Sequence, residues 1–269
     1  MRNAVSLIVA LAFSTVPAFA LMIDDFSVNT DPPGSVNAGY SYWDAAGYDV
    51  GADGSSVLGE WREYYVGAYE TGTVAAELRV YVAGGEFYSS GDADIEGQSS
   101  VYWDGASNDY AYWYQGANWP WPAPITANPT SWNDCAVLDR YGLGGIDLTE
   151  GDVQDRFRLS AYGDHDWMLE VTVWSGSNET DWAFARQSIT ATTVYDNVYL
   201  PFSSFGGGAG TIDWHDVGAV RMTILNEPGV AELQAHVDFI ETIPEPTTMG
   251  LLGVGGMLLM AASKRRKKK

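Results

Sequence analysis

Short runs in which apolar and polar residues alternate dominate the middle of the chain. In the clearest run, 167–174, Leu169, Val171 and Val173 share one face and Glu170 lies on the other. A period of two with one apolar face is the pattern of a half-buried strand. Runs of the same kind cover 73–82, 157–160, 182–190, 197–202, 219–225 and 231–240.

Turn signals separate these runs. Clusters of small and polar residues at 83–85, 175–178 and 206–208 favour chain reversal. Many short strands with frequent turns indicate an all-β chain that folds as a two-sheet antiparallel β-sandwich. Residues 21–243 are enough for one such domain.

The two ends of the chain have a different character. Residues 1–20 contain an early arginine, an apolar run and a final Ala-Phe-Ala, which is the pattern of a secretory signal peptide cleaved after Ala20. At the other end, Pro244-Glu245-Pro246 precedes an uncharged run, 247–263, and a basic tail, 264–269. Seventeen uncharged residues are at the short limit for a membrane-spanning helix, and the basic tail would stay on the cytoplasmic side.

These three C-terminal parts, in this order, resemble the PEP-CTERM sorting signal of Gram-negative bacteria. The resemblance implies recognition by an exosortase, a membrane cysteine protease-transpeptidase, with processing near Pro244, Glu245 and Pro246. It also implies export to the cell surface, the outer envelope or an exopolysaccharide matrix, with transient anchoring in the membrane through 247–263. An ordinary single-span anchor would give the same topology without processing.

Charge is divided unevenly between these parts. Residues 21–243 contain no lysine and carry seven arginines against thirty-four acids, a net charge of −27. Nucleic-acid binding needs clustered Lys and Arg, so the composition argues against a nucleic-acid partner. Several strings in 137–241, such as Gly145-Ile146-Asp147-Leu148-Thr149, resemble the extracellular jelly-roll part of many PEP-CTERM proteins. This resemblance implies a jelly-roll-like sandwich and identifies no ligand.

Aromatic residues gather in 102–121, and they suggest a polysaccharide-binding face. Sugar rings have apolar faces that stack on flat aromatic side chains. A Pro-rich loop, 115–135, follows and is expected at the surface. Core filling is the competing interpretation, because aromatic residues are also common in strands. The candidate sugar-binding residues are Trp103, Tyr110, Tyr112, Tyr114, Trp119 and Trp121.

The acidic string Asp92, Asp94 and Glu96 allows two further hypotheses. On a strand, these alternate residues would share one face, as in the catalytic strand of laminarinase-like jelly-roll glycosidases, which the string loosely resembles. By that resemblance Asp92 takes the place of the nucleophile and Glu96 that of the acid/base. The string also begins like an EF-hand loop, but the twelfth position is Trp103 instead of Glu. A structural Ca²⁺ is a separate hypothesis, with candidate ligands Asp92, Asp94, Glu96, Asp24 and Asp25.

We therefore expect an exported surface or matrix protein that is not an enzyme, with polysaccharide binding as one hypothesis. A secreted glycoside hydrolase or lyase is the first alternative. A structural or adhesion subunit without sugar specificity is the second.

Overall fold

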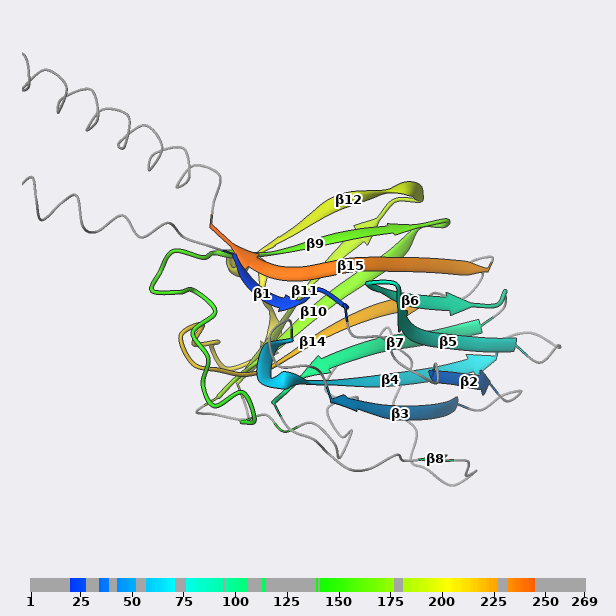
Figure 1. The fold of residues 1–269 in the computed structure, drawn as a ribbon, viewed down its shortest axis with the longest axis horizontal. Coiled ribbons are helices and arrows are strands. Elements are labelled where there is room, and N and C mark those ends of the chain that lie inside the picture. The colour runs from blue at the N-terminus through cyan, green and yellow to red at the C-terminus, as the bar shows by residue number, and fades with distance from the viewer. Residues whose placement is uncertain are drawn as a thin grey trace, which may run out of the picture.

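The computed structural model describes residues 20–27, 34–38, 43–51, 57–70, 76–93, 95–105, 113–114, 139, 141–176, 181–226 and 232–244. Within these ranges nearly all regular structure is β, and every strand pairing is antiparallel (Figure 1). The two sheets confirm the prediction of an all-β antiparallel sandwich. The predicted signal peptide and the uncharged segment 247–263 lie outside the described residues.

The first sheet has seven strands. Its order is β12 (Thr192–Pro201), β9 (Arg156–Gly163), β15 (Leu233–Ile243), β6 (Glu86–Gly91), β5 (Ala76–Ala83) and β2 (Gly34–Ala38). The seventh strand, β1 (Leu21–Asp24), pairs with the second half of β15, whereas β6 pairs with its first half.

The second sheet has eight strands. Its order is β13 (Gly206–Ala209), β11 (Trp182–Ile189), β10 (Trp167–Ser175), β14 (Val217–Asn226), β7 (Ile95–Trp103), β4 (Trp61–Glu70), β3 (Trp43–Gly51) and β8 (Trp113–Tyr114). Two short 3₁₀ turns, η1 (Leu58–Glu60) and η3 (Phe202–Ser204), connect strands.

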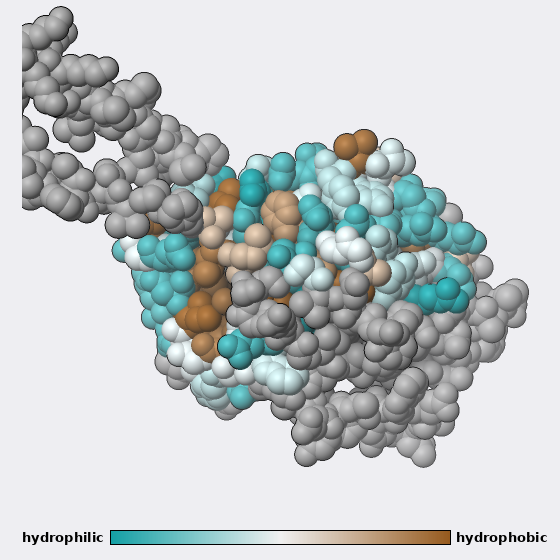
Figure 2. Space-filling view, viewed as in Figure 1, coloured by the Kyte–Doolittle hydropathy of each residue, from teal (hydrophilic) through white to brown (hydrophobic). Residues whose placement is uncertain are grey.

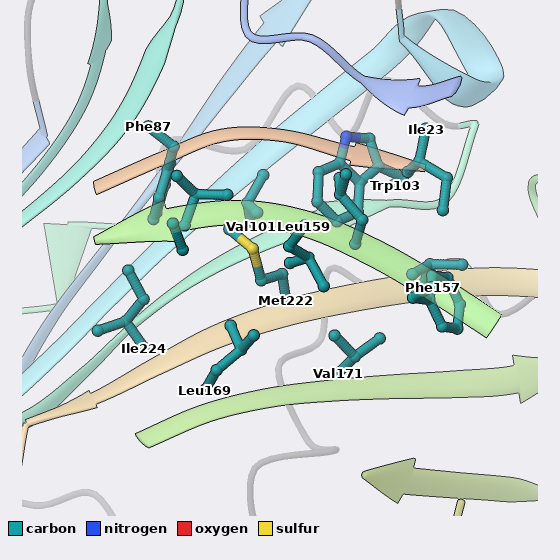
Figure 3. Close-up of a cluster of buried hydrophobic side chains, with 14 of the residues drawn as sticks. Ile23, Phe87, Val101, Trp103, Phe157, Leu159, Leu169, Val171, Met222 and Ile224 are labelled. Carbon is teal, nitrogen blue, oxygen red and sulfur yellow. The ribbon is translucent and has the colours of Figure 1, made fainter. Parts of the chain in front are cut away.

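The core lies between the two sheets, where alternate residues of strands such as β6 and β9 point inward. Leu169 and Val171 of β10 belong to the same buried cluster as Phe157 and Leu159 of β9 (Figure 3). All four side chains are fully buried. Complete burial of such side chains contributes about 1.5–3 kcal/mol each, so this interdigitation is the main force that holds the sheets together. The apolar face predicted for 167–174 is therefore confirmed, but the expectation of a half-buried strand is wrong, because Glu170, Thr172 and Trp174 on the other face are buried as well.

A buried ion pair joins β1 to the second sheet. Arg62 Nε of β4 donates to Asp24 Oδ2 at 2.6 Å, and Trp103 Nε1 of β7 donates to the same oxygen at 2.8 Å. The backbone N–H of Phe26 donates to Asp24 Oδ1 at 2.7 Å, and the Arg62 guanidinium lies 5.2 Å from the Phe26 ring centroid. The first described strand is thus fixed to both sheets: by pairing to β15 and by charge to β4.

Both described ends of the domain lie at one end of the sandwich. Leu21 is paired with Thr242, and Met22 with Glu241, so β1 begins where β15 ends (Figure 1). Figure 2 shows hydrophobic residues gathered near this end, while the remaining described surface in that view is mostly hydrophilic.

One predicted turn is wrong. The glycines at 206–208 form the edge strand β13, which pairs with β11. A side chain at Gly208 would collide with the backbone of Trp182, so glycine permits this close approach of the two strands.

Candidate functional site

The structure places Trp103 in the core, away from any surface for sugar binding. Its side chain is fully buried and its indole N–H is bonded to Asp24 (Figure 3). This placement overturns the expectation for Trp103, because an inward position on β7 leaves no aromatic face for a ligand. Tyr114 lies on β8. The other candidates, Tyr110, Tyr112, Trp119 and Trp121, lie outside the described residues.

The three acids of 92–96 do not share a strand. Asp92 lies in the connection after β6, Glu96 is on β7, and Asp94 is outside the described residues. The strand alignment behind the glycosidase hypothesis is therefore wrong, because the chain turns between the first and the last acid. Asp92 itself is exposed.

The remaining calcium candidates, Asp24 and Asp25, lie at the end of β1. Asp24 is fully buried against Arg62, and Asp25 accepts a hydrogen bond from the backbone of Ser27 at 2.9 Å. Within the described ranges, no group of three or more His, Cys, Asp or Glu side chains is placed to hold a metal ion. Asp24 is therefore a partner in a structural ion pair.

A cluster of tyrosines around one histidine lies on the outer face of the first sheet. We call it the tyrosine–histidine cluster, and its members are Tyr81, Glu86, Tyr88, Tyr162, Tyr195 and His236. Their strands, β5, β6, β15, β9 and β12, are consecutive in the sheet. Neighbours of these residues along each strand, such as Val80, Phe87 and Val237, are buried in the core, so the cluster points away from it.

Strand register aligns these side chains in a row. Tyr81 is paired with Tyr88, Tyr88 with His236, and His236 with Tyr162. The ring centroids of Tyr81 and Tyr88 are 4.7 Å apart with an interplanar angle of 8°, and those of Tyr162 and His236 are 4.1 Å apart at 16°. Each of these rings gives one of its two flat faces to a neighbour in the row.

The two stacked pairs meet edge to face. Tyr88 and His236 are 4.3 Å apart at 67°, and Tyr195 closes the row against Tyr162 at 4.7 Å and 88°. Cross-strand aromatic contacts of this kind stabilise sheets by about 0.2–1 kcal/mol each. The row therefore stiffens the sheet as well as shaping its surface.

Glu86 is the charged centre of the cluster. His236 Nδ1 lies 3.2 Å from Glu86 Oε2. Burial alone would raise the pKa of Glu86, but contacts with Tyr195, Tyr88 and His236 outweigh it and lower the pKa below its ordinary value. The Tyr195 hydroxyl is shielded from solvent and has no partner at hydrogen-bonding geometry among the described residues. Glu86 is thus an ionised acceptor held in place by its neighbours.

The pKa values of the other titratable groups in the cluster are shifted as well. The hydrogen bond to Glu86 raises the pKa of Tyr88, and burial raises the pKa of Tyr162 and of Tyr195. Burial lowers the pKa of His236, so its imidazole is neutral at pH 7, and burial also raises the pKa of nearby Asp238.

Perturbed groups concentrate here. Six described groups in or beside the cluster have a pKa that clearly departs from its ordinary value: Glu86, Tyr88, Tyr162, Tyr195, His236 and Asp238. Asp24, Asp147 and His215 are perturbed elsewhere in the chain. Concentrations of perturbed titratable groups mark functional sites more often than other surface. The cluster is therefore the candidate site.

The second sheet carries a contrasting polar group on its outer face. Glu170 accepts from Arg221 Nη2 at 2.8 Å and from Arg186 Nε at 2.8 Å, and Thr172 bonds to both Glu170 and Arg221. Glu170, Thr172 and Arg221 are at most 3% exposed. Buried and mutually paired, these groups serve the fold and leave no surface for a ligand.

A pocket opens where β11 and β13 approach η3. Its volume is about 290 Å³, and aromatic side chains and the glycines of β13 line it. Trp214 stacks on Phe202 at 4.0 Å and 6° in its wall. No charged side chain lines it, and its polar groups come from Thr211, the tryptophan indoles and the backbone of the glycines.

The end of the sandwich leads into a sorting segment. β15 ends at Ile243, and Pro244, the first residue of Pro-Glu-Pro, is buried beside it. Residues 242–267 match the PEP-CTERM protein-sorting motif. The PEP-CTERM motif implies export, with anchoring or processing at the C-terminus. The first two residues of the motif, 242 and 243, are part of β15. Glu245, Pro246 and the uncharged segment lie outside the described residues, among which no helix is long and apolar enough to cross a membrane.

Solved structures similar to the chain include carbohydrate-binding modules. A family 11 module from Clostridium thermocellum in complex with a β-1,3-1,4-mixed-linked tetrasaccharide has 12% identity and a TM-score of 0.35, covering 84% of this chain and 97% of the module. A variant family 29 module complexed with mannohexaose has 8% identity and a TM-score of 0.34, covering 84% and 93%. An agarase has 9% identity and a TM-score of 0.39, covering 85% of this chain and 25% of the enzyme. TM-scores this low do not establish a shared fold, and no curated protein matches the chain.

Proposed function

We propose that this protein is exported, sorted by an exosortase through its PEP-CTERM motif, and displayed as a non-catalytic polysaccharide-binding component of the cell surface or its matrix. The motif at 242–267 supports the sorting. The tyrosine–histidine cluster supports the binding. Polysaccharide binding, the final location in the envelope and the site of C-terminal processing are parts of this proposal that the motif alone does not establish.

One observation carries the binding function. Four tyrosines and one histidine form a part-exposed row across five strands, around an ionised Glu86 that Tyr88, Tyr195 and His236 contact. Carbohydrates are recognised by aromatic rings combined with rigid hydrogen-bonding groups, and strands position such groups more firmly than loops do. A firmly positioned carboxylate accepts hydrogen bonds from sugar hydroxyls without first losing side-chain freedom.

The position of the cluster suits a tethered protein. His236 lies seven residues before Ile243 on the same strand, which corresponds to about 24 Å at about 3.4 Å per residue. The sorting motif begins at that strand's end. While the segment 247–263 anchors the chain before processing, the cluster would be held away from the membrane by this length of strand.

Sorting is tested by mass. The full-length precursor is expressed in bacteria with and without an exosortase, and the exported protein is purified in detergent and measured as an intact mass. We expect an N-terminus at Leu21 in both strains and a C-terminus near 244–246 only in the exosortase strain. Equal masses in the two strains would indicate that the C-terminal segment is a membrane anchor that the exosortase does not process.

Binding and catalysis are separated in one panel. The exported protein is run through gels containing each of a set of polysaccharides and is then incubated with the same polymers. We expect retardation by at least one polymer and no release of reducing ends from any. Released reducing ends would favour the hydrolase alternative, and no retardation by any polymer would favour a structural subunit.

A further inference from the structure

Resting on the proposed binding function, the geometry points to a ligand class: we infer that the tyrosine–histidine cluster takes an extended, uncharged polysaccharide that lies across the strands. The chain would be recognised through hydroxyl groups at the edges of the rings. Flat stacking of sugars on aromatic faces would contribute little.

Ring geometry reduces the aromatic surface that is left for flat stacking. Tyr81 and Tyr88 stack on one another, and so do Tyr162 and His236. A sugar ring needs a free aromatic face, and each of these four rings gives one of its two faces to a neighbour in the row. What remains toward solvent are ring edges and phenolic hydroxyls, each able to donate and to accept a hydrogen bond.

Two of these hydroxyls are not tied to the carboxylate. Among the described residues, the contacts that lower the pKa of Glu86 come from Tyr195, Tyr88 and His236. Tyr81 and Tyr162 are both part-exposed and lie on β5 and β9, with β6 and β15 between them. They flank the carboxylate, so a ligand that crosses the sheet meets hydroxyl, carboxylate and hydroxyl in turn.

The length of the row favours a polymer. Five adjacent strands at about 4.8 Å spacing span about 19 Å from β5 to β12. This span is longer than one sugar ring, so a short oligosaccharide leaves part of the row without contacts. Affinity is expected to rise with chain length and to level off once the ligand spans the row.

Charge selects against acidic polymers. Glu86 is ionised, Asp164 lies close enough to affect both His236 and Tyr162, and Asp238 is adjacent. Residues 21–243 carry a net charge of −27. A uronate or sulfated chain would bring like charge to this surface, whereas an uncharged glycan meets no repulsion.

Calorimetry with matched ligands and variants tests the inference. The exported full-length protein in detergent is titrated with neutral glucan oligomers of increasing length, with alginate as the acidic polymer and with chitosan as the amino polymer. Tyr81→Phe and Tyr162→Phe keep the stacked rings and remove the hydroxyls, and Glu86→Gln removes the charge. Tyr199→Phe, an exposed tyrosine of β12 outside the row, is the matched control.

We expect binding of the neutral oligomers that increases with length, a loss of about fivefold to tenfold for each hydroxyl removed, and no change in Tyr199→Phe. Binding only of alginate or chitosan would overturn the uncharged class but keep the proposed glycan-binding function. If the Tyr81→Phe and Tyr162→Phe variants bind the neutral oligomers as tightly as the parent protein does, recognition through these hydroxyls is overturned. No binding of any polymer would overturn both proposals.

Discussion

Asp24 lies with its side chain fully buried between two donors, Arg62 and Trp103. Its hydrogen bonds link β1 to β4 and β7, three elements distant in sequence. A buried pair adds little net stability over an apolar pair of the same shape, but loss of one member leaves an isolated charge in the core. The pair therefore fixes where β1 sits.

Replacement of Arg62 tests this role. Arg62→Met leaves the Asp24 carboxylate without its cation, and we expect the free energy of unfolding at pH 7 to fall by about 3–5 kcal/mol in urea denaturation. Arg156→Met is the control, since Arg156 pairs with its neighbour Asp155 at the part-exposed edge. That change should cost less than about 1 kcal/mol. Equal costs for the two variants would contradict the account of the buried pair.

The pH dependence of stability gives a second test of Asp24. Burial raises the pKa of Asp24 to about 6 from 3.8, although Arg62, Trp103 and the backbone of Phe26 oppose the shift. Between these two values the folded protein binds a proton that the unfolded chain has released. The contribution of Asp24 to stability therefore falls as pH rises from about 4 to about 6 and is constant above. Urea midpoints across this range should show a smaller decline in Asp24→Asn; identical slopes would refute the raised pKa.

At the scale of elements, strands with continuous apolar runs could be predicted from sequence. The run at 167–174 became β10 and that at 231–240 became most of β15. The strands β1, β2, β3, β4, β6, β7, β8 and β13 were not predicted. Glycines and aspartates interrupt β3, and β13 is almost entirely glycine. In these two strands pairing to a neighbour overrides weak local preference.

The tyrosine–histidine cluster was not predictable from local pattern. Each strand shows a polar or aromatic residue at an outward position, such as Tyr81 between Val80 and Val82, and this is ordinary alternation. Only the strand order, which places β15 between β9 and β6, brings Tyr162 beside His236. The aromatic-rich segment 102–121 drew attention because its aromatics are close in sequence, and its Trp103 serves the core.

The edge strand β13 allows a matched test of local structure. Gly207 has φ of 71°, and a Cβ there would lie 2.6 Å from the Phe184 ring, whereas a Cβ on Gly206 meets nothing. We expect Gly207→Ala to lower the free energy of unfolding by about 1–2 kcal/mol, because an L-residue is strained in the left-handed region. Gly206→Ala should be within about 0.5 kcal/mol of the parent protein in urea denaturation. A Gly207→Ala protein as stable as Gly206→Ala would show that β13 does not pack as described.

At the scale of the whole molecule, one strand connects sorting and binding. β15 pairs with β9 along one edge and with β6 and β1 along the other, carries His236 near its start, and ends inside the PEP-CTERM motif. Its antiparallel partner β1 brings the predicted mature N-terminus to the same end. Under the proposed function, this end carries the sorting motif, and the cluster lies about 24 Å from it along β15.

Histidine NMR tests the central claim most directly. The chain has three histidines, His165, His215 and His236, of which only His236 belongs to the tyrosine–histidine cluster. A neutral glucan oligomer is added to the exported protein in detergent, and the imidazole resonances are followed. The account predicts that the His236 resonances shift in a saturable manner while those of His165 and His215 stay in place. Saturable shifts confined to His165 or His215, or no shift at a ligand concentration at which calorimetry records binding, would contradict it.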